Sequence, residues 1–343
     1  MKKLLSICTG ALLATACSAK SPFDGIWYIT TPDNGAAWLK VDTEAMPPKV
    51  EMLWEVGGVE AAKTATLTRH LIPDDTASLY IEYPWDHWYM TATGMRRDNI
   101  GQLTPTLYID KEGVKAWLYR KKNGEAVPQE GSRLAITRAA PMPPAPDVGA
   151  LKFGDPIELF DGKTLDGWRL TNPKDVSGWS VKDGILTNDP KLEPKVDGGP
   201  IPPQFGNLRT DREFEDFRLT LEVRLPKNGN SGVYLRGRYE VQTTDSHGRP
   251  VSKGGTMGAI YDRIAPTANA AKPAGEWNTY DVTLADRHVT VIINGQKVID
   301  NQPVEGCTGG ALDADDTKPG PIYFQGDHTS VEYRNIKLYP RIP

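Results

Sequence analysis

Apolar and polar residues alternate strictly along two neighbouring stretches in the second half of the chain. Over residues 217–225 every second side chain is apolar, and the side chains between them are Arg, Thr, Glu and Arg. A period of two predicts a β-strand with one buried face. Residues 228–232, Asn-Gly-Asn-Ser-Gly, favour positive φ and predict a tight turn, after which the alternation resumes over residues 233–242. The pattern therefore predicts two strands joined by that turn.

The polar face of the second predicted strand holds an unusual set of side chains. An ordinary solvent-facing row contains Lys, Glu, Thr and Ser, whereas this row combines an aromatic ring, guanidinium groups, a carboxylate and an amide, from Tyr234, Arg236, Arg238, Glu240 and Gln242. Sugars offer hydroxyl groups to such donors and C–H faces to aromatic rings. The row therefore indicates either a carbohydrate-binding surface or an exposed strand face held by ion pairs.

Similar short patterns along the rest of the chain predict an all-β protein. Runs rich in β-branched and aromatic residues are separated by Gly, Pro, Asn and Asp, and no convincing amphipathic helix is found. A chain of 343 residues is long enough for two domains, each with its own core. We predict a smaller N-terminal β-barrel or sandwich over residues 22–138, a stiff proline-rich linker over residues 139–150, and a second β-domain over residues 151–343.

The N-terminus has the features of an export signal. Lys2 and Lys3 precede an apolar run at residues 4–16, which is too short to span a bilayer as a permanent helix. Small residues then lead into Cys17, an arrangement that resembles a bacterial lipoprotein signal over residues 1–17, with Cys17 as the lipidated residue. Plain secretion with cleavage nearby is the alternative. Either route predicts an exported protein, in the periplasm or at the outer membrane or cell surface, with a lipid anchor as the membrane contact.

Charge and cysteine content exclude several other classes of protein. The formal net charge is −4, so no basic surface indicates nucleic acid as a partner. Of the three cysteines, only Cys307 lies outside the signal segment, which excludes a disulfide framework.

Four ordered motifs in the second domain resemble the 3-keto-disaccharide hydrolase family. They are Leu-Phe-Asp-Gly-Lys-Thr-Leu-Asp-Gly-Trp at residues 159–168, the stretch at residues 228–242, Lys-Pro-Ala-Gly-Glu-Trp-Asn-Thr-Tyr at residues 272–280, and Gly-Pro-Ile-Tyr-Phe-Gln-Gly-Asp-His at residues 320–328 with Val-Glu-Tyr-Arg-Asn-Ile following. The resemblance implies a concanavalin A-like jelly-roll sandwich of two curved antiparallel sheets, with substrate on the concave face. It also implies cleavage of glycosidic bonds in 3-keto-disaccharides or 3-keto-glycosides, and a sugar 3-dehydrogenase that supplies the keto sugar.

The chemistry that the resemblance implies needs few groups. A ketone at C3 of a sugar acidifies the proton at C2, so one base allows β-elimination of the anomeric oxygen, and water then adds back to give net hydrolysis. The reaction needs a general base, donors for the enolate and an acid for the leaving group. Related glucanases of this fold carry Glu-x-Asp-x-x-Glu on one strand, whereas residues 240–245 here read Glu-Val-Gln-Thr-Thr-Asp, which argues against a conventional glucanase.

Residue type and position give candidate roles in such a site. Glu240 or His328 is the candidate base, and Arg236 would stabilise the enolate. The remaining candidates would bind the sugar, through hydroxyl positioning, ring stacking at the rim, or as part of the polar row: Tyr234, Gln242, Gln325, Trp179 and Tyr261.

Two short motifs place a histidine beside a carboxylate, at Asp245-Ser-His247 and Gly326-Asp-His328. Acid–base work, a divalent cation that stabilises the enolate, and simple loop hydrogen bonding all remain open for them. The acidic run at residues 313–316 lacks the Gly and distal Glu of a calcium loop and predicts a solvated turn. A non-catalytic carbohydrate-binding protein is the main alternative to an enzyme, because lectins share the implied fold.

Overall fold

The structure is a computed structural model that describes two β-domains. The described residues are 21–31, 34–55, 57–62, 64–69, 77–82, 88–91, 94–97, 103–110, 113–122, 125–190 and 205–343. The predicted signal segment, with Cys17, therefore lies outside the described residues. No α-helix occurs in the described part, where the one helical element is a short 3₁₀ helix at Val148–Ala150, so the predicted all-β fold class is confirmed.

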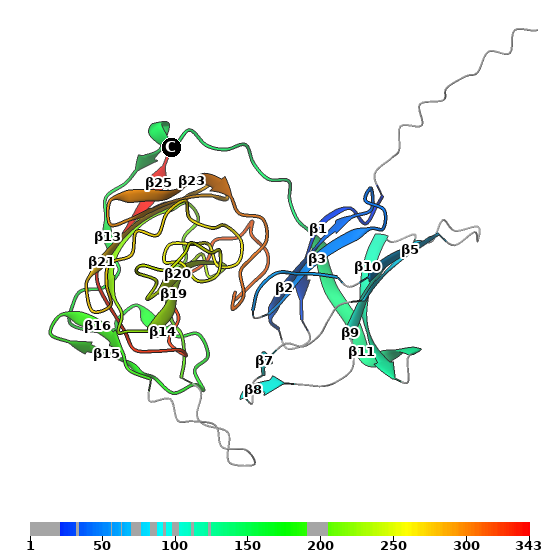
Figure 1. Ribbon diagram of the computed structural model, residues 1–343, viewed down its shortest axis with the longest axis horizontal. Helices are drawn as coiled ribbons and strands as arrows, with labels where there is room; N and C mark the ends of the chain where they lie inside the picture. Colours follow the sequence, from blue (N-terminus) through cyan, green and yellow to red (C-terminus); the bar gives the residue numbers. More distant parts are fainter. Residues whose placement is uncertain are drawn as a thin grey trace, which may run out of the picture.

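The C-terminal domain is a sandwich of two antiparallel sheets (Figure 1, left). The larger sheet has the order β15 (Trp179–Lys182), β16 (Ile185–Asn188), β25 (Val331–Ile342), β18 (Phe217–Arg224), β21 (Asn278–Ala285), β22 (His288–Ile293) and β23 (Gln296–Pro303), with β12 (Lys152–Phe153) and β13 (Ile157–Glu158) also paired to β25. The smaller sheet has the order β14 (Trp168–Leu170), β17 (Leu208–Thr210), β24 (Tyr323–Phe324), β19 (Asn230–Leu235) and β20 (Tyr239–Thr244).

Alternating apolar residues of both sheets form one shared core. Along β18 buried and partly exposed residues alternate without interruption, which confirms the strand predicted from residues 217–225. Its inward side chains meet inward residues of the smaller sheet, such as Val233, Val241 and Phe324, in a single hydrophobic cluster. The opposite face of the smaller sheet is therefore free to carry polar side chains.

The structure corrects the prediction for residues 233–242, which are two strands and not one. The chain reverses after Leu235, and β19 pairs with β20 in an antiparallel hairpin. Arg236 and Gly237 have φ values of 54° and 66°, as a two-residue type I′ turn requires, and the Arg238 N–H donates to the Leu235 carbonyl. Arginine rarely adopts positive φ, so a turn that begins at Arg236 is difficult to predict from the sequence.

The N-terminal domain is one long sheet that curls around its own core (Figure 1, right). Its order is β4 (Glu60–Ala61), β3 (Lys49–Trp54), β2 (Ala36–Asp42), β1 (Gly25–Thr30), β11 (Glu125–Arg138), β10 (Gly113–Lys122), β9 (Leu103–Asp110), β6 (Ala77–Glu82) and β5 (Thr64–Arg69). The long strand β11 joins the two halves, because its first part pairs with β10 and its last four residues pair with β1. A separate hairpin is formed by β7 (Trp88–Thr91) and β8 (Gly94–Arg97).

A second apolar cluster joins the two domains. Tyr28, Ala36, Trp38 and Leu53 of the N-terminal domain pack with Cys307 and Ala314 of the sandwich. The connecting segment is also held, because the Arg287 guanidinium donates to the carbonyl oxygens of Ala140 and Pro141. The domains are therefore packed against each other and not merely tethered.

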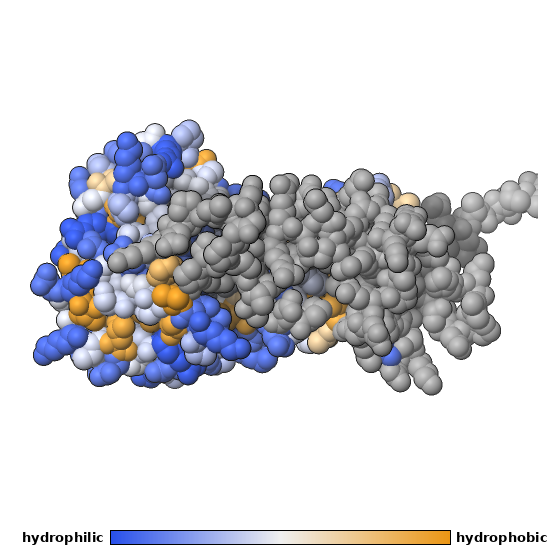
Figure 2. Space-filling model, turned by 90° about the horizontal axis from the view of Figure 1, so that it is seen from below, coloured by the Kyte–Doolittle hydropathy of each residue, from blue (hydrophilic) through white to orange (hydrophobic). Residues whose placement is uncertain are grey.

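No helix in the described ranges is long and apolar enough to cross a membrane. On the face shown in Figure 2, the coloured part of the sandwich is mainly hydrophilic, and its apolar residues form small separate groups. Scattered apolar residues of this kind are ordinary on a folded protein.

The structure corrects the solvated turn expected at residues 313–316. Asp316 is 1% exposed, and both of its carboxylate oxygens lie 2.9 Å from Arg287 Nη1. The pair lies beside the interdomain cluster and ties the sandwich to the linker through the other nitrogen of Arg287.

Asp316→Ala should lower the free energy of unfolding by about 3–5 kcal/mol, because it leaves the buried Arg287 charge without its partner. Asp300→Ala removes the exposed pair with Lys297 and should change stability by about 0–1 kcal/mol. Chemical denaturation of both variants measures the difference. Equal losses in the two variants would contradict the assignment of Asp316 as a buried structural charge.

Candidate active site

The candidate site lies on the face of the smaller sheet that points away from the core. Tyr234 pairs with Glu240 on β20 and with Tyr323 on β24, so the three side chains form one row across the sheet. Their strand neighbours Val233, Val241 and Phe324 point into the core, which fixes the row on the opposite face. Of the polar row inferred from the sequence, Tyr234 and Glu240 therefore lie next to each other on neighbouring strands, and Tyr323 was not part of that prediction.

Two tyrosines close the back of the site. The rings of Tyr234 and Tyr323 stack with centroids 3.8 Å apart. The Tyr234 hydroxyl lies 2.9 Å from Glu240 Oε2 and 2.7 Å from the Gly309 carbonyl oxygen, and the Tyr323 hydroxyl donates to the Gly310 carbonyl at 2.5 Å. Both rings are almost completely buried. They act as a rigid support for Glu240 and are not open to a sugar ring, so the expected sugar contact of Tyr234 is corrected.

Glu240 is a buried carboxyl group. It is 4% exposed, and burial, which penalises the charged form, raises its pKa to about 8 against the opposing effects of the Tyr234 hydroxyl and the His328 charge. Space for it comes from Gly232, because a Cβ atom at that position would lie 2.5 Å from Glu240 Oε1. At neutral pH Glu240 is therefore mainly a neutral proton donor.

His328 and Asp327 form an acid–base dyad beside Glu240. His328 Nδ1 lies 2.8 Å from Asp327 Oδ1. Burial lowers the pKa of His328, but the hydrogen bond and the charge of Asp327, with the charge of Glu240, outweigh it, so the pKa lies above its usual value. With Nδ1–H donating to the carboxylate, Nε2 carries the free lone pair of the neutral ring. The Asp327 carboxylate therefore makes His328 a stronger base than a free imidazole.

A third carboxyl group, that of Asp175, belongs to the loop before β15 and lies close enough to Asp327 for the two charges to interact. Burial raises the pKa of Asp175, and the charge of Asp327 raises it further, whereas the Asn172 side chain, which donates at 2.7 Å, opposes the shift. No local sequence motif pointed to Asp175. Its interaction with Asp327 arises only in the folded protein, because the two residues are far apart along the chain.

The structure assigns Arg236 and Trp179 to other roles than those predicted. Arg236 is 3% exposed, and its guanidinium donates to the main-chain carbonyls of Asp316 and Lys318, so it stabilises a loop and is not available for an enolate. Trp179 is 6% exposed and packs on Phe324 and Tyr333. Its indole donates to the Gly206 carbonyl, so it is a core residue and not a stacking ring at a rim.

The two glutamines differ in how free they are. Gln242 is 4% exposed, and its amide donates to the Gly254 carbonyl, so it holds the loop after β20 and is not free to bind a sugar hydroxyl. Gln325 is partly exposed, and its buried side-chain oxygen has no partner among the described residues. A buried acceptor without a partner is the kind of group that a substrate hydroxyl can satisfy. Tyr261, also partly exposed, donates its N–H to the Glu240 carbonyl, and burial and then the Glu240 charge raise the pKa of its hydroxyl.

The motif at Asp245 and His247 lies away from this group. Asp245 follows Glu240 by five residues of mostly extended chain, a span of about 17 Å. Its carboxylate accepts from the Asn228 N–H, whereas His247 Nδ1 contacts the Ala271 carbonyl, so the two side chains serve separate loop contacts. The contacts of both side chains fit loop hydrogen bonding, which is one of the three alternatives left open for this motif. Among the described residues no group of three or more His, Cys, Asp or Glu could hold a metal ion.

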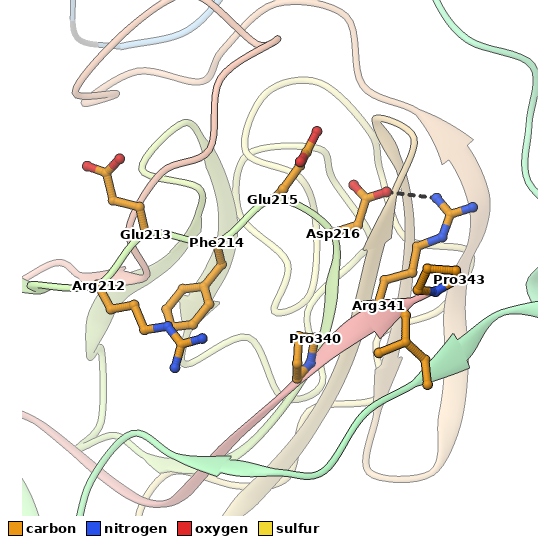
Figure 3. A pocket seen from close by; sticks show the side chains of 9 residues that line it. Arg212, Glu213, Phe214, Glu215, Asp216, Pro340, Arg341 and Pro343 are labelled. Atoms are coloured by element: carbon orange, nitrogen blue, oxygen red, sulfur yellow. Dashed lines mark hydrogen bonds and ion pairs between the residues drawn. The ribbon is translucent and has the colours of Figure 1, made fainter.

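A pocket of about 540 Å³ occurs elsewhere, beside the end of β25 (Figure 3). Three of its five charged side chains are in ion pairs, since Arg341 pairs with Asp216 and Asp286, and Glu213 pairs with Arg209. None of the dyad or tyrosine residues lines it. Its residues offer no acid–base pair, so it is not the candidate site.

Comparisons with known proteins cover the domain that carries the candidate site. A family model described as a 3-keto-α-glucoside-1,2-lyase-like domain matches residues 155–339. The chain is 27% identical to the 3-keto-disaccharide hydrolase of Bacteroides thetaiotaomicron, in an alignment over 41% of this chain and 55% of that protein, so the chain spans about half the length of that relative.

Solved structures with similarity to the chain include a Parabacteroides distasonis protein provisionally named a glycosyl hydrolase. It is 30% identical, with 64% of this chain and 98% of the other aligned and a TM-score of 0.43. The non-specific endo-β-1,3(4)-glucanase SCLam of family GH16 is 13% identical, with 60% and 95% aligned and a TM-score of 0.35.

The raised pKa of Glu240 predicts a distinct pH dependence of stability. Because the folded-state pKa lies above the unfolded value, the stabilisation by the neutral form is complete below about pH 4.5 and is lost as the pH rises to about 8. Glu240→Gln cannot ionise, so above pH 8 it should exceed the wild type by on the order of 5 kcal/mol, with little difference at pH 4.5. Thermal unfolding from pH 4 to pH 9 checks this. A difference that does not change with pH would rule out a neutral Glu240 in the folded state.

The space that Gly232 leaves predicts a second effect. Gly232→Ala should push the Glu240 carboxyl away from its seat and lower turnover by at least tenfold, while the sheet itself stays folded. Gly248→Ala, at a glycine with open space around its missing Cβ, is the control for added bulk, with a local cost from its positive φ. Equal turnover of wild type and Gly232→Ala would show that the position of Glu240 does not matter.

Proposed function

The chain belongs to the family of 3-keto-α-glucoside-1,2-lyase-like domains, and from this premise we propose that it cleaves the glycosidic bond of 3-keto-disaccharides or 3-keto-glycosides. The observation that carries the proposal is the pairing of a neutral carboxyl group, Glu240, with the His328–Asp327 dyad. Enzymes separate an acid from a base by giving the two groups different environments, and these groups have such environments.

In the proposed reaction His328 is the base. Its Nε2 removes the C2 proton, which the C3 ketone has made acidic, and Asp327 stabilises the imidazolium that forms. The electron pair forms the enolate of C2 and C3. The hydroxyl of Tyr261, which stays protonated at neutral pH, is the proposed donor to the enolate oxygen, and the side-chain oxygen of Gln325 is the proposed acceptor for a substrate hydroxyl.

Glu240 is the proposed acid. As the enolate collapses, the bond between C1 and the glycosidic oxygen breaks, a C1=C2 double bond forms, and Glu240 gives its proton to the departing oxygen. Water then adds to C1, with Glu240 taking one proton of the water, and His328 returns its proton to C2. The net result is hydrolysis, and release of the unsaturated sugar before water adds would make the same site a lyase.

We also propose the cellular setting that the N-terminal sequence and the chemistry support. The signal-like residues ending at Cys17 support export and lipid anchoring, and the substrate requires an enzyme of the sugar 3-dehydrogenase class to oxidise C3 first. A carbohydrate-binding lipoprotein without catalysis is the competing function.

The function is tested with 4-nitrophenyl 3-keto-α-glucoside, a 3-keto-disaccharide, and the same two sugars unoxidised. Cleavage of the keto sugars alone supports the proposal. Binding of the sugars without cleavage would replace it with the competing function.

The acid role of Glu240 predicts a split between substrates. 4-Nitrophenolate leaves without a proton, whereas the sugar oxygen of a disaccharide needs one. Glu240→Gln should therefore lose about 10²–10⁴-fold in kcat on the disaccharide and much less on the nitrophenyl substrate, whereas His328→Asn should lose a similar factor on both. Steady-state kinetics on the two substrates measures the split. Equal losses for Glu240→Gln on both would make Glu240 the base.

The pH profile of the wild type follows from the same roles. Activity on the disaccharide should fall above about pH 8, where Glu240 loses the proton that the leaving oxygen needs. This high-pH limb should be absent with the nitrophenyl substrate. A limb of the same position and depth on both substrates would contradict the assignment.

A further inference from the structure

One loop of the sandwich supplies the carbonyl groups that hold the two tyrosines. We call residues 305–311 the site loop. On the sandwich side, its Thr308 N–H and hydroxyl donate to the Arg238 carbonyl, and the Thr308 hydroxyl oxygen accepts the Glu240 N–H at 3.0 Å. Its Gly309 and Gly310 carbonyls accept from the hydroxyls of Tyr234 and Tyr323. The position of this loop therefore controls the surroundings of Glu240.

The N-terminal domain contacts the site loop at several residues. Trp38 of β2 is fully buried, and its indole donates to the Cys307 carbonyl at 2.9 Å. A Cβ atom on Gly306 would lie 2.7 Å from the Trp38 ring, so the indole fills the space that this glycine leaves. The Gly310 N–H donates to the Glu55 carbonyl at 2.7 Å. At Gly309 a Cβ atom would lie 2.3 Å from the Gly57 carbonyl, so the two backbones are in direct contact.

The position of the site loop affects which acceptor takes the single hydrogen of the Tyr234 hydroxyl. The Tyr234 hydroxyl has one hydrogen and two possible acceptors, the Gly309 carbonyl at 2.7 Å and Glu240 Oε2 at 2.9 Å. When the hydrogen goes to Gly309, the Tyr234 oxygen can accept a hydrogen bond only from a neutral Glu240 carboxyl. The Tyr234 hydroxyl lowers the pKa of Glu240 when it donates to this carboxyl group, so loss of the competing Gly309 carbonyl would favour that donation and lower the pKa further.

We propose that the N-terminal domain is a positioning element of the active site, in which Trp38 anchors the site loop so that the Gly309 carbonyl competes with Glu240 for the Tyr234 hydrogen and thereby favours Glu240 as a proton donor. The contribution to catalysis rests on the proposed function, whereas the effect on Glu240 does not. In this proposal the described residues of the domain supply no reacting group and act through Gly309 and Tyr234.

The groups that influence Glu240 directly are all in the sandwich. Among the described residues, the titratable groups whose charges act on Glu240 or respond to it are Tyr234, Tyr261, Tyr280, Tyr323, Asp327, His328 and Tyr333. Around the site loop, Lys40 pairs with Glu305 at the exposed rim, Arg263 stacks on Trp38 and Cys307 is a buried thiol. Trp38 is uncharged, so a change there reaches Glu240 through geometry and not through charge.

The test compares the full-length variants Trp38→Ala and Trp38→Phe with Lys40→Ala. Lys40 lies on the same strand and also bridges to the site loop, but through an exposed ion pair. Each variant is made with and without Glu240→Gln, and the pH at which the difference in thermal stability between the two members of each pair stops growing reports the titration of Glu240 in the folded protein. This readout needs no substrate.

In the Lys40→Ala background, Glu240 should titrate at about 8, as in the wild type. In the Trp38→Ala background the titration should move at least one pH unit towards the ordinary glutamate value of about 4.3, with Trp38→Phe between the two. Activity on the disaccharide should show the same acidward shift of its high-pH limb. In a Tyr234→Phe background, the Trp38 variants should no longer cause the shift, because the relay is broken.

A folded Trp38→Ala protein whose Glu240 still titrates near 8 would overturn the proposal. If Trp38→Ala does not fold, Trp38→Phe decides by the same two outcomes. A shift that persists with Tyr234→Phe would also overturn it, since a general loosening would then be the cause. A shift in titration without any turnover of keto sugars would leave this inference standing and remove the proposed function.

Discussion

Burial of the Glu240 carboxyl is the constraint on which the rest of the site depends. A carboxylate loses much of its hydration in such a place, so the neutral form is favoured unless a cation or several donors compensate. The surrounding groups compensate only in part, and the resulting pKa of about 8 makes Glu240 an acid at neutral pH. Gly232 has no side chain and so leaves the space that the Glu240 carboxyl group occupies. The stacked rings of Tyr234 and Tyr323 support the same carboxyl group from the neighbouring strands.

Residues of both domains contribute to the surroundings of the Glu240 carboxyl group. The sandwich provides the sheet, the dyad and the tyrosines. The N-terminal domain contacts the site loop, whose carbonyl groups accept hydrogen bonds from the tyrosine hydroxyls. An apolar interface with a fully buried tryptophan at its centre gives this contact the rigidity of a domain core. A non-catalytic accessory domain connected only by a flexible linker would not need such an interface.

Much of the fold could be predicted from the sequence, because it depends on local patterns. The strict alternation over residues 217–225 corresponds to β18, and turn residues with β-branched runs are sufficient to predict an all-β chain. The site was harder. Tyr234 and Glu240 of the predicted row do lie on one face of the smaller sheet, and their part in a site stays a prediction. The roles expected of Arg236 and Trp179 do not fit the structure, because Arg236 occupies a positive-φ turn and Trp179 packs inward on residues far along the chain. The roles of Trp38 and Asp175 arise only from tertiary contacts, which no local period reveals.

Difference infrared spectroscopy of the carboxyl C=O stretch tests the central claim most directly. The wild type and Glu240→Gln would be titrated side by side without substrate, so that one carboxyl band separates them. The account predicts that a protonated carboxyl band of the wild type persists at pH 7, disappears as the pH rises through about 8, and is missing from Glu240→Gln at every pH. Loss of that band by pH 5–6, near the ordinary glutamate range, would mean that Glu240 is a carboxylate at neutral pH and would contradict the account.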